Sequence, residues 1–177
     1  TDGRASAYWV WGNVVPVKAS SAKHLYVYQG IFDRVRGHDI YNFEGLSPRP
    51  IDNYSGKVTL TYRFENLVPP AMVFSRFVAH RQAWSRHGIF VDGIQIDYDS
   101  PTGKLLKYSN WLSSLNNIVG NNVSVSITGL GDWLASAPSS HLKELSQRVS
   151  FVAFMMYHGS HPLKNIKNYT ERLAKLS

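Results

Sequence analysis

The sequence contains no cysteine. Disulfide bridges and thiolate-bound metal sites are therefore excluded for this chain. It also lacks any run of about eighteen or more apolar residues, so it encodes no typical membrane-spanning helix. No G-x-S-x-G sequence occurs, which removes the support for an esterase built around such a serine turn.

Two further absences concern anionic partners. No expected strand is followed by a glycine-rich phosphate loop, which argues against a nucleotide-binding sheet. The formal net charge is +7, yet the basic residues are scattered and include Arg76, Arg81 and Arg86 along one expected helix. Solvated helix faces explain that pattern better than a nucleic-acid surface, so we do not expect a nucleic-acid partner. The charge leaves polyanion binding as a weaker alternative.

What is present is an ordinary globular composition, with 177 residues, 44% hydrophobic and 18% charged. That length suits one domain with its own core, and we expect a single domain over 1–177. The 5 Trp and 10 Tyr residues either stack on sugar faces or fill the core. The chain begins Thr1-Asp2-Gly3 rather than with Met, which fits a cleaved export signal, a remnant of a tag or a longer precursor, and we expect a periplasmic or secreted protein.

Segments of strand-like composition alternate with segments of helical periodicity. Strands are expected at 7–11, 24–28, 57–64, 91–98, 123–128 and 151–157, helices at 71–87, 105–119, 139–148 and 163–176, and a long polar loop at 33–56. Strands separated by helices of this length indicate parallel βαβ units. The expected fold is α/β, a TIM-barrel-like (β/α) domain with parallel strands and only about six βα units.

A complete barrel typically needs about 250 residues, so we expect this one to be truncated or incomplete. An open sheet edge after the sixth strand exposes unpaired backbone groups. We therefore expect either a homo-oligomeric partner or a further C-terminal segment to cover that edge.

The segment Val91–Asp99 carries the clearest chemical signal. Side chains alternate along a strand, so Gln95, Asp97 and Asp99 share one face, which should point toward the barrel axis. The two carboxylates have Cα atoms about 6.6 Å apart, and a neighbouring negative charge raises the pKa of a carboxyl toward that of a proton donor. The C-terminal end of a strand is where barrels hold their active sites.

Structural readings of the same two residues stay open. Asp99 precedes Ser100-Pro101 and could serve only to favour the start of the next helix. Asp97 could be a buried carboxylate held by backbone amides.

The run from Asp92 to Asp99, DGIQIDYD, resembles the D-G-x-D-x-D-x-E signature of the family 18 glycoside hydrolases, or chitinases. Met155–His158, MMYH, resembles the M-x-Y-D segment of that family. The resemblance implies that Asp99 is the general acid, that Asp97 orients the substrate acetamide and that Tyr157 supports the same group. Three positions depart from the pattern, and they are Gln95 for Asp, Asp99 for Glu, and His158 for Asp.

The chain also resembles an uncharacterised bacterial family of glycoside-hydrolase-like barrel proteins. That resemblance rests on short motifs, which are Asp97-Tyr98-Asp99, Ser126-Ile127-Thr128 followed by Trp133, and Val10-Trp11. It covers most of the chain from Tyr8 to Tyr157. It implies a carbohydrate as the partner.

Further residues are candidates for holding a sugar. Trp11, Tyr28 and Trp133 lie at expected strand ends and either stack on sugar or fill the core. The polar candidates are Glu65, Gln95, Thr128 and His158. Arg63 beside Glu65 either binds polar substrate or forms a salt bridge at the rim. His158-x-x-His161 offers two metal ligands without an evident third, so we expect no metal and no cofactor.

Together these features predict a carbohydrate-active protein, a glycoside-hydrolase-like barrel acting on a polysaccharide or glycoconjugate. Asp99 is the expected general acid and Asp97 the orienting or stabilising carboxylate. Carboxylates on one strand do not readily flank a bond from both sides, so substrate assistance or a carboxylate from elsewhere is also expected. The alternative is a non-catalytic carbohydrate-binding or scaffold protein on a degenerate chitinase-like barrel, because Asp99 is one methylene shorter than Glu.

Overall fold

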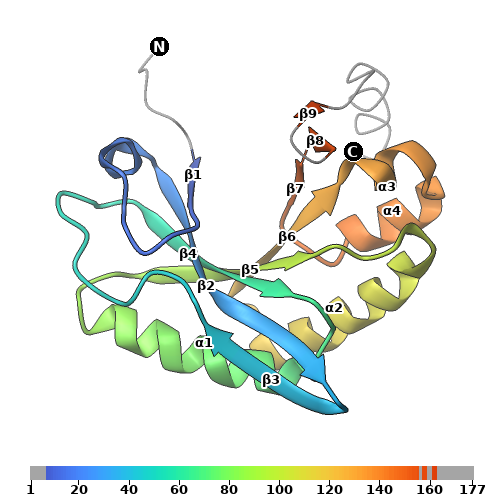
Figure 1. The fold of residues 1–177 in the computed structure, drawn as a ribbon, viewed down its shortest axis with the longest axis horizontal. Coiled ribbons are helices and arrows are strands. Elements are labelled where there is room, and N and C mark those ends of the chain that lie inside the picture. The colour runs from blue at the N-terminus through green and yellow to red at the C-terminus, as the bar shows by residue number, and fades with distance from the viewer. Residues whose placement is uncertain (1–6, 156, 159–160, 163–177) are drawn as a thin grey trace.

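The computed structural model describes residues 7–155, 157–158 and 161–162, with side chains described as far as Phe154 (Figure 1). The helix expected at 163–176 lies outside the described residues.

Six parallel strands form the main sheet, a half-barrel with helices between the strands. Their order is β1 (Ala7–Val10), β2 (His24–Val35), β4 (Lys57–Phe64), β5 (Val91–Tyr98), β6 (Ser124–Leu130) and β7 (Val152–Met155). Neighbouring strands in space are also neighbours along the chain, apart from the hairpin strand β3. This arrangement confirms the expected incomplete TIM-barrel-like fold.

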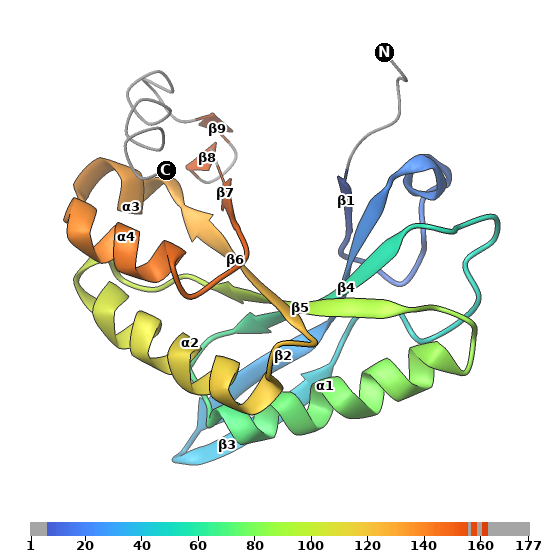
Figure 2. The same cartoon turned by 180° about the vertical axis from the view of Figure 1, so that it is seen from behind.

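The helices cover the convex side of the curved sheet (Figures 1 and 2). They are α1 (Pro70–Ser85), α2 (Leu105–Val119) and α4 (Ser139–Ser146), with the short α3 (Gly131–Ser136) directly after β6. Two 3₁₀ helices, η1 (Val17–Ser21) and η2 (Thr102–Lys104), lead into β2 and α2. The sheet residues that face the helices are apolar, as alternation along each strand predicts. Ile94 and Ile96 of β5 are fully buried there, as are Phe77 and Trp84 of α1.

The prediction of a long loop at 33–56 is wrong for residues 33–43. Strand β2 continues to Val35 and pairs antiparallel with β3 (His38–Phe43). Arg36 and Gly37 between them both have positive φ, 50° and 81°, which is the geometry of a two-residue hairpin turn. The hairpin escaped prediction because β3 is polar and partly exposed, so it carries no apolar run. Within this antiparallel pairing Arg34 lies opposite Asp39, and Arg34 Nε forms an ion pair with Asp39 Oδ1 at 2.8 Å.

The sixth parallel strand is shorter than the expected 151–157. Strand β7 ends at Met155, and Tyr157 belongs to a separate antiparallel pair formed by β8 (Tyr157–His158) and β9 (His161–Pro162). Tyr157 is therefore not part of the main parallel sheet, contrary to the prediction. The end of β6 explains the shortening, because β7 pairs only along Ile127–Leu130.

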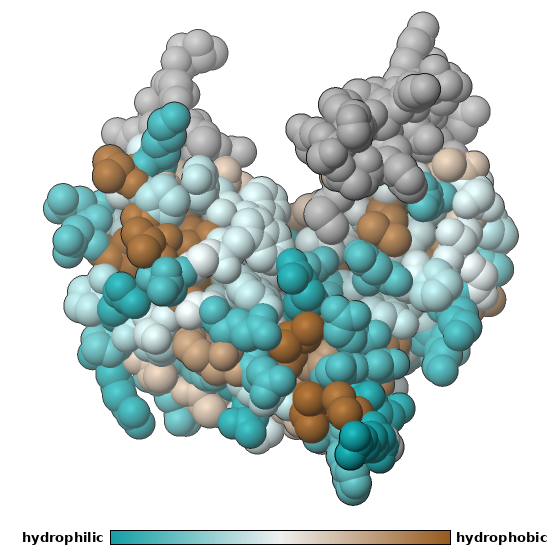
Figure 3. Space-filling view, viewed as in Figure 1, coloured by the Kyte–Doolittle hydropathy of each residue, from teal (hydrophilic) through white to brown (hydrophobic). Residues whose placement is uncertain are grey.

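Within the described ranges, β1 and β7 each have a strand partner on one side only. In Figure 3 apolar side chains gather over the segment between β1 and β2, which contains η1. The exposed large hydrophobic residues of that segment are Trp11, Val14 and Val17. No helix in the described part of the chain is both long and apolar enough to cross a lipid bilayer.

Candidate active site

The concave face of the half-barrel is lined by polar and aromatic side chains. Strand register sets them in rows, because Thr61 pairs with Gln95, Gln95 with Ser126, and Arg63 with Asp97. Residues of this face are nevertheless almost fully enclosed, since Thr61 and Gln95 are 0% exposed and Asp97 is 6% exposed. Enclosed polar groups are costly unless they are hydrogen-bonded, so their partners indicate what the face is built to hold.

Asp97 is held by two side chains from neighbouring strands. Its Oδ1 accepts a hydrogen bond from the Thr128 hydroxyl of β6 at 2.7 Å, and its Oδ2 lies 3.5 Å from Nε of Arg63 on β4. These partners, rather than the backbone amides considered above, keep the carboxylate oriented. Thr128 thus acts on Asp97, and each carboxylate oxygen of Asp97 has a polar side-chain neighbour.

Asp99 lies on the same side of β5 but reaches solvent. Both carboxylates line one cavity of about 110 Å³ together with Arg63 and Glu65 at the C-terminal ends of β4 and β5. Burial raises the pKa of Asp99, the charges of Asp97 and Glu65 raise it further, and Arg63 opposes them. Because Asp99 also contacts water, the increase is smaller than an enclosed carboxyl would show.

Arg63 connects the carboxylates to two aromatic rings. Its Cζ lies 5.8 Å from the ring centroid of Trp11 and 5.5 Å from that of Tyr28. Arginine over a ring face at this distance is a cation–π contact. Arg63 also forms the salt bridge considered for it at the rim of the barrel, but its partner is Asp97 rather than Glu65.

The two rings differ in what they offer a ligand. Trp11 is 41% exposed, so part of its face is free to stack. Tyr28 is 5% exposed, and its hydroxyl donates to Glu44 Oε2 at 2.6 Å. Glu44 was not expected at the site. It reaches Tyr28 because the chain after β3 folds back on β2, where Glu44 N donates to Gln29 O and a Cβ on Gly45 would overlap Tyr28 O.

Gln95 of β5 is fully buried, and its side chain contacts residues of β1 and β4. Its Oε1 accepts from Trp9 Nε1 at 2.9 Å and from the Thr61 hydroxyl at 3.1 Å. Its Nε2 has no hydrogen-bond partner among the described residues, although it is buried. A buried donor without a partner is unusual and is satisfied by a water or by a ligand atom.

The sugar-stacking role considered for Trp133 is wrong. Trp133 is 0% exposed, and its indole N–H donates to Ser100 O at 2.8 Å. Its ring meets Tyr108 and Phe154 edge-on, at centroid distances of 6.3 and 6.4 Å. Trp133 is a core residue because α3 begins directly after β6 and packs the ring against Tyr108 of α2 and Phe154 of β7. The side chains of Tyr157 and His158 lie outside the described residues.

A second polar cluster lies at the other end of the strands. The Thr59 hydroxyl donates to Asp92 Oδ1 at 2.9 Å, so the 2.7 Å contact between His24 Nε2 and Thr59 Oγ1 is a hydrogen bond donated by the imidazole. The rings of His24 and Tyr26 stack at 4.4 Å. Asp92, which matches the first Asp of the chitinase signature, is thus far along the strand from Asp97 and Asp99 and holds neighbouring strands together.

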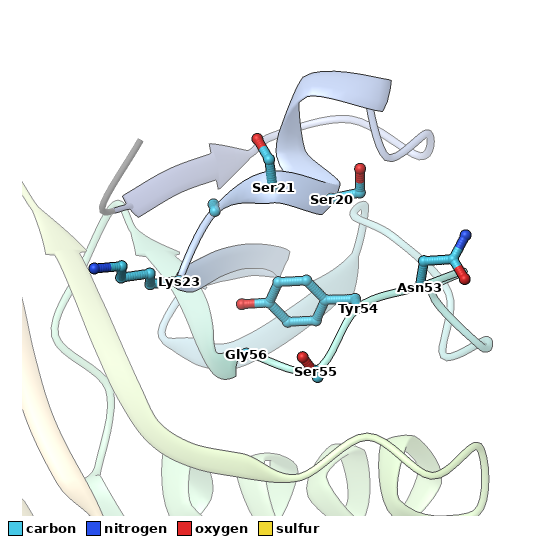
Figure 4. Close-up of a pocket in the computed structure, with 8 residues that line it drawn as sticks. Ser20, Ser21, Lys23, Asn53, Tyr54, Ser55 and Gly56 are labelled. Atoms are coloured by element: carbon cyan, nitrogen blue, oxygen red, sulfur yellow. The ribbon is translucent and has the colours of Figure 1, made fainter. Parts of the chain in front are cut away.

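The pocket in Figure 4 lies at this same end, where η1 leads into β2 and residues 53–56 lead into β4. It measures about 440 Å³, and its lining includes Ser20, Lys23 and Tyr54 but no carboxylate. The Tyr54 hydroxyl is used locally, because it donates to Lys57 O at 2.7 Å. We assign it no chemistry. Within the described residues, no three histidine, aspartate or glutamate side chains group in a way that could hold a metal ion.

The bond between Thr128 and Asp97 gives a testable expectation. Thr128→Val keeps the shape of the side chain but leaves Asp97 Oδ1 without its donor, so the free energy of unfolding should fall by about 1–3 kcal/mol. Chemical denaturation measures the change. Thr128→Ser restores the hydroxyl and should recover most of the loss, whereas equal stability of the two variants would show that the bond does not support the fold.

Comparison with solved structures shows what this fold is similar to. The chitinase domain of the spore coat protein CotE from Clostridium difficile superposes with a TM-score of 0.59 at 15% sequence identity. The match covers 98% of this chain and 61% of the chitinase domain, so the chain spans less than two thirds of that domain. At this identity the likeness shows a chitinase-like barrel fold. No curated protein sequence matches the chain.

The sequence itself matches one family. The profile described as "Domain of unknown function (DUF3142)" covers residues 65–167, which include β5, β6 and both aspartates of the site. That match spans more than half of the 177 residues, and the protein therefore belongs to the DUF3142 family.

Proposed function

We propose that the protein is a carbohydrate-active, glycoside-hydrolase-like barrel whose site is the cavity between Asp97 and Asp99. The observation that carries the proposal is the pairing of two unlike carboxylates in one cavity at the C-terminal end of β5. Asp97 is enclosed and held by Thr128 and Arg63, whereas Asp99 reaches solvent and has a raised pKa. Two carboxyl groups in different environments are the arrangement that acid catalysis of glycoside cleavage needs.

In this proposal Asp99 delivers a proton to the glycosidic oxygen of the bound sugar. Proton donation is favoured by partial burial and by the neighbouring charges of Asp97 and Glu65, which raise the pKa of Asp99 and keep part of it protonated above the pH at which an ordinary aspartate ionises. Asp97, held beside Arg63, stabilises the positive charge that develops on the sugar ring. A neighbouring group of the substrate, or Glu65 across the cavity, completes the pair of groups that must act from two sides.

Two other side chains would position the sugar. Trp11 presents a partly exposed ring beside Arg63, suited to stacking against the apolar face of a pyranose. Gln95 Nε2 supplies a hydrogen-bond donor beneath the carboxylates that is free within the described residues.

The test is hydrolysis of a panel of oligosaccharides that includes N-acetylated members, with the wild type and Asp99→Asn. The proposal expects at least one substrate to be cleaved by the wild type and lost with the variant. Binding without cleavage of any panel member would favour the alternative below.

That alternative is a carbohydrate-binding protein without turnover. It is favoured by the 3.5 Å approach of Arg63 to Asp97, which partly occupies the carboxylate, and by the shorter reach of Asp99 compared with glutamate.

Both functions share one expected result. Trp11→Ala should weaken sugar binding by about tenfold, because stacking of an aromatic ring is worth roughly 0.5–1.5 kcal/mol and the variant also loosens Arg63. Calorimetric titration with the best-bound panel member measures the change. Phe43→Ala, on β3 and 44% exposed, is the matched control and should bind normally. Equal affinities of Trp11→Ala and the wild type would remove Trp11 from the site.

A further inference from the structure

A second polar pocket lies beside the carboxylate cavity. It measures about 440 Å³ and is formed by the end of β2, the segment after β4, the end of β5 and the first turns of α2. It shares Tyr98 with the carboxylate cavity, and its lining residues Asn66 and Ser100 directly follow Glu65 and Asp99 in the chain. The two pockets therefore meet at Tyr98, at the C-terminal end of β5.

The lining of this pocket, named the basic pocket here, is cationic. It includes Arg34, Lys104 and Lys107, and no acidic residue. Arg34 is paired through Nε with Asp39, but neither lysine forms an ion pair within the described residues. The amide side chains of Asn66 and Asn110 and the ring of Trp111 complete walls suited to a polar, ring-shaped ligand.

The two lysines lie at the N-terminus of α2, where a positive charge is unfavourable. Lys104 precedes α2 and Lys107 lies in its first turn, while that turn contains no acidic residue. The N-terminus of a helix carries a partial positive charge, so cations there cost stability and an anion would offset the cost.

A second, independent observation also points to a ligand. Tyr108 lines the basic pocket and is 0% exposed, yet its hydroxyl has no hydrogen-bond partner among the described residues. A buried hydroxyl without a partner is unusual and is satisfied by a water or by a ligand atom.

We propose that the basic pocket binds the carboxylate or sulfate groups of an acidic polysaccharide, an inference that rests on the proposed sugar site next to it. The carboxylates Asp97, Asp99 and Glu65 repel an acidic sugar unit from their own cavity. Lys104 and Lys107 attract one a unit further along. The two pockets together select a chain in which the unit next to the cleaved bond is neutral and its neighbour is acidic. The net charge of +7 favours encounter with such a polymer.

The test compares three oligosaccharides of equal length, one neutral and N-acetylated, one a uronate oligomer and one sulfated, titrated calorimetrically against the whole chain. We expect at least one acidic oligomer to bind more tightly than the neutral one, with an affinity that falls as salt is added. The double variant Lys104→Gln/Lys107→Gln should weaken binding of that acidic oligomer by about tenfold, as loss of two partly exposed charge contacts predicts, and leave the neutral oligomer unaffected. Lys143→Gln on α4, also exposed, is the control and should change neither affinity.

Several outcomes overturn the proposal. One is neutral and acidic oligomers binding equally well to the wild type, and another is the double variant binding the acidic oligomer as well as Lys143→Gln does. Tighter, lysine-dependent binding of a single-stranded polyribonucleotide would assign the pocket to nucleic acid instead. If the proposed function of the carboxylate cavity is wrong, the result is different. The lysine-dependent preference for acidic oligomers would then remain, and Asp99→Asn would leave turnover unchanged.

Discussion

Asp99→Asn is expected to lower the rate of glycoside cleavage by about 100- to 10,000-fold, the range over which a positioned general acid contributes. Asparagine has nearly the same shape but cannot donate the proton, so binding of the sugar should persist while turnover is lost. Steady-state kinetics on the best substrate of the panel measures this, with kcat expected to fall and KM to change little. Asp52→Asn, at an exposed position outside the carboxylate cavity, is the matched control.

The raised pKa of Asp99 sets the sign of two pH effects. Turnover should decline as the pH rises through that pKa, because the proton to be donated is lost. A folded-state pKa above the ordinary value of 3.8 means that Asp99 stabilises the fold below that value and loses this contribution as the pH rises through the folded pKa. At neutral pH the variant should therefore be at least as stable as the wild type, and the difference should vanish in acid.

These stability measurements separate chemistry from folding. A variant that is inactive and also much less stable at neutral pH would contradict the assignment of Asp99 as a general acid with a raised pKa. A variant with unchanged kcat would remove Asp99 from the chemistry altogether.

Trp133→Ala is expected to reduce the free energy of unfolding by about 3–5 kcal/mol, the usual cost of removing a buried aromatic side chain. The variant loses the hydrogen bond to Ser100 O and the edge contacts with Tyr108 and Phe154, and it leaves a cavity between β6 and α2. Chemical denaturation provides the value. Trp133→Phe keeps most of the volume and loses mainly the N–H donor, so it should be clearly more stable than Trp133→Ala.

The comparison with Trp11 distinguishes a core tryptophan from a sugar-stacking one. Trp11→Ala should change stability by no more than about 1 kcal/mol, because the ring is partly exposed and its removal leaves no closed cavity. The two tryptophans are thus expected to show opposite behaviour, with loss of stability for Trp133 and loss of sugar binding for Trp11. A Trp133→Ala protein of normal stability that failed to bind sugar would restore the stacking role rejected above.

Parts of the fold and the site are determined by local sequence. The strands at 57–64 and 91–98 have the predicted bounds, because each alternates between apolar residues that pack under helices and polar residues on the other face. The same alternation places Gln95 and Asp97 on the concave face, since the direction of a side chain along a strand depends only on its position. Hence Asp97, and Asp99 two residues further along, could be identified from the sequence alone.

Tertiary structure decided which residues meet across the sheet. Gln95 accepts a hydrogen bond from Trp9, 86 residues earlier, and Arg63 lies over Trp11 and Tyr28 while pairing with Asp97. Such contacts depend on strand register and on the curvature of the sheet, which no local pattern encodes. Burial of Trp133 likewise followed from the turn between β6 and α3. The sequence therefore determined which chemical groups the site contains. The partners of these groups, their exposure and the basic pocket next to them depend on contacts between distant strands and helices.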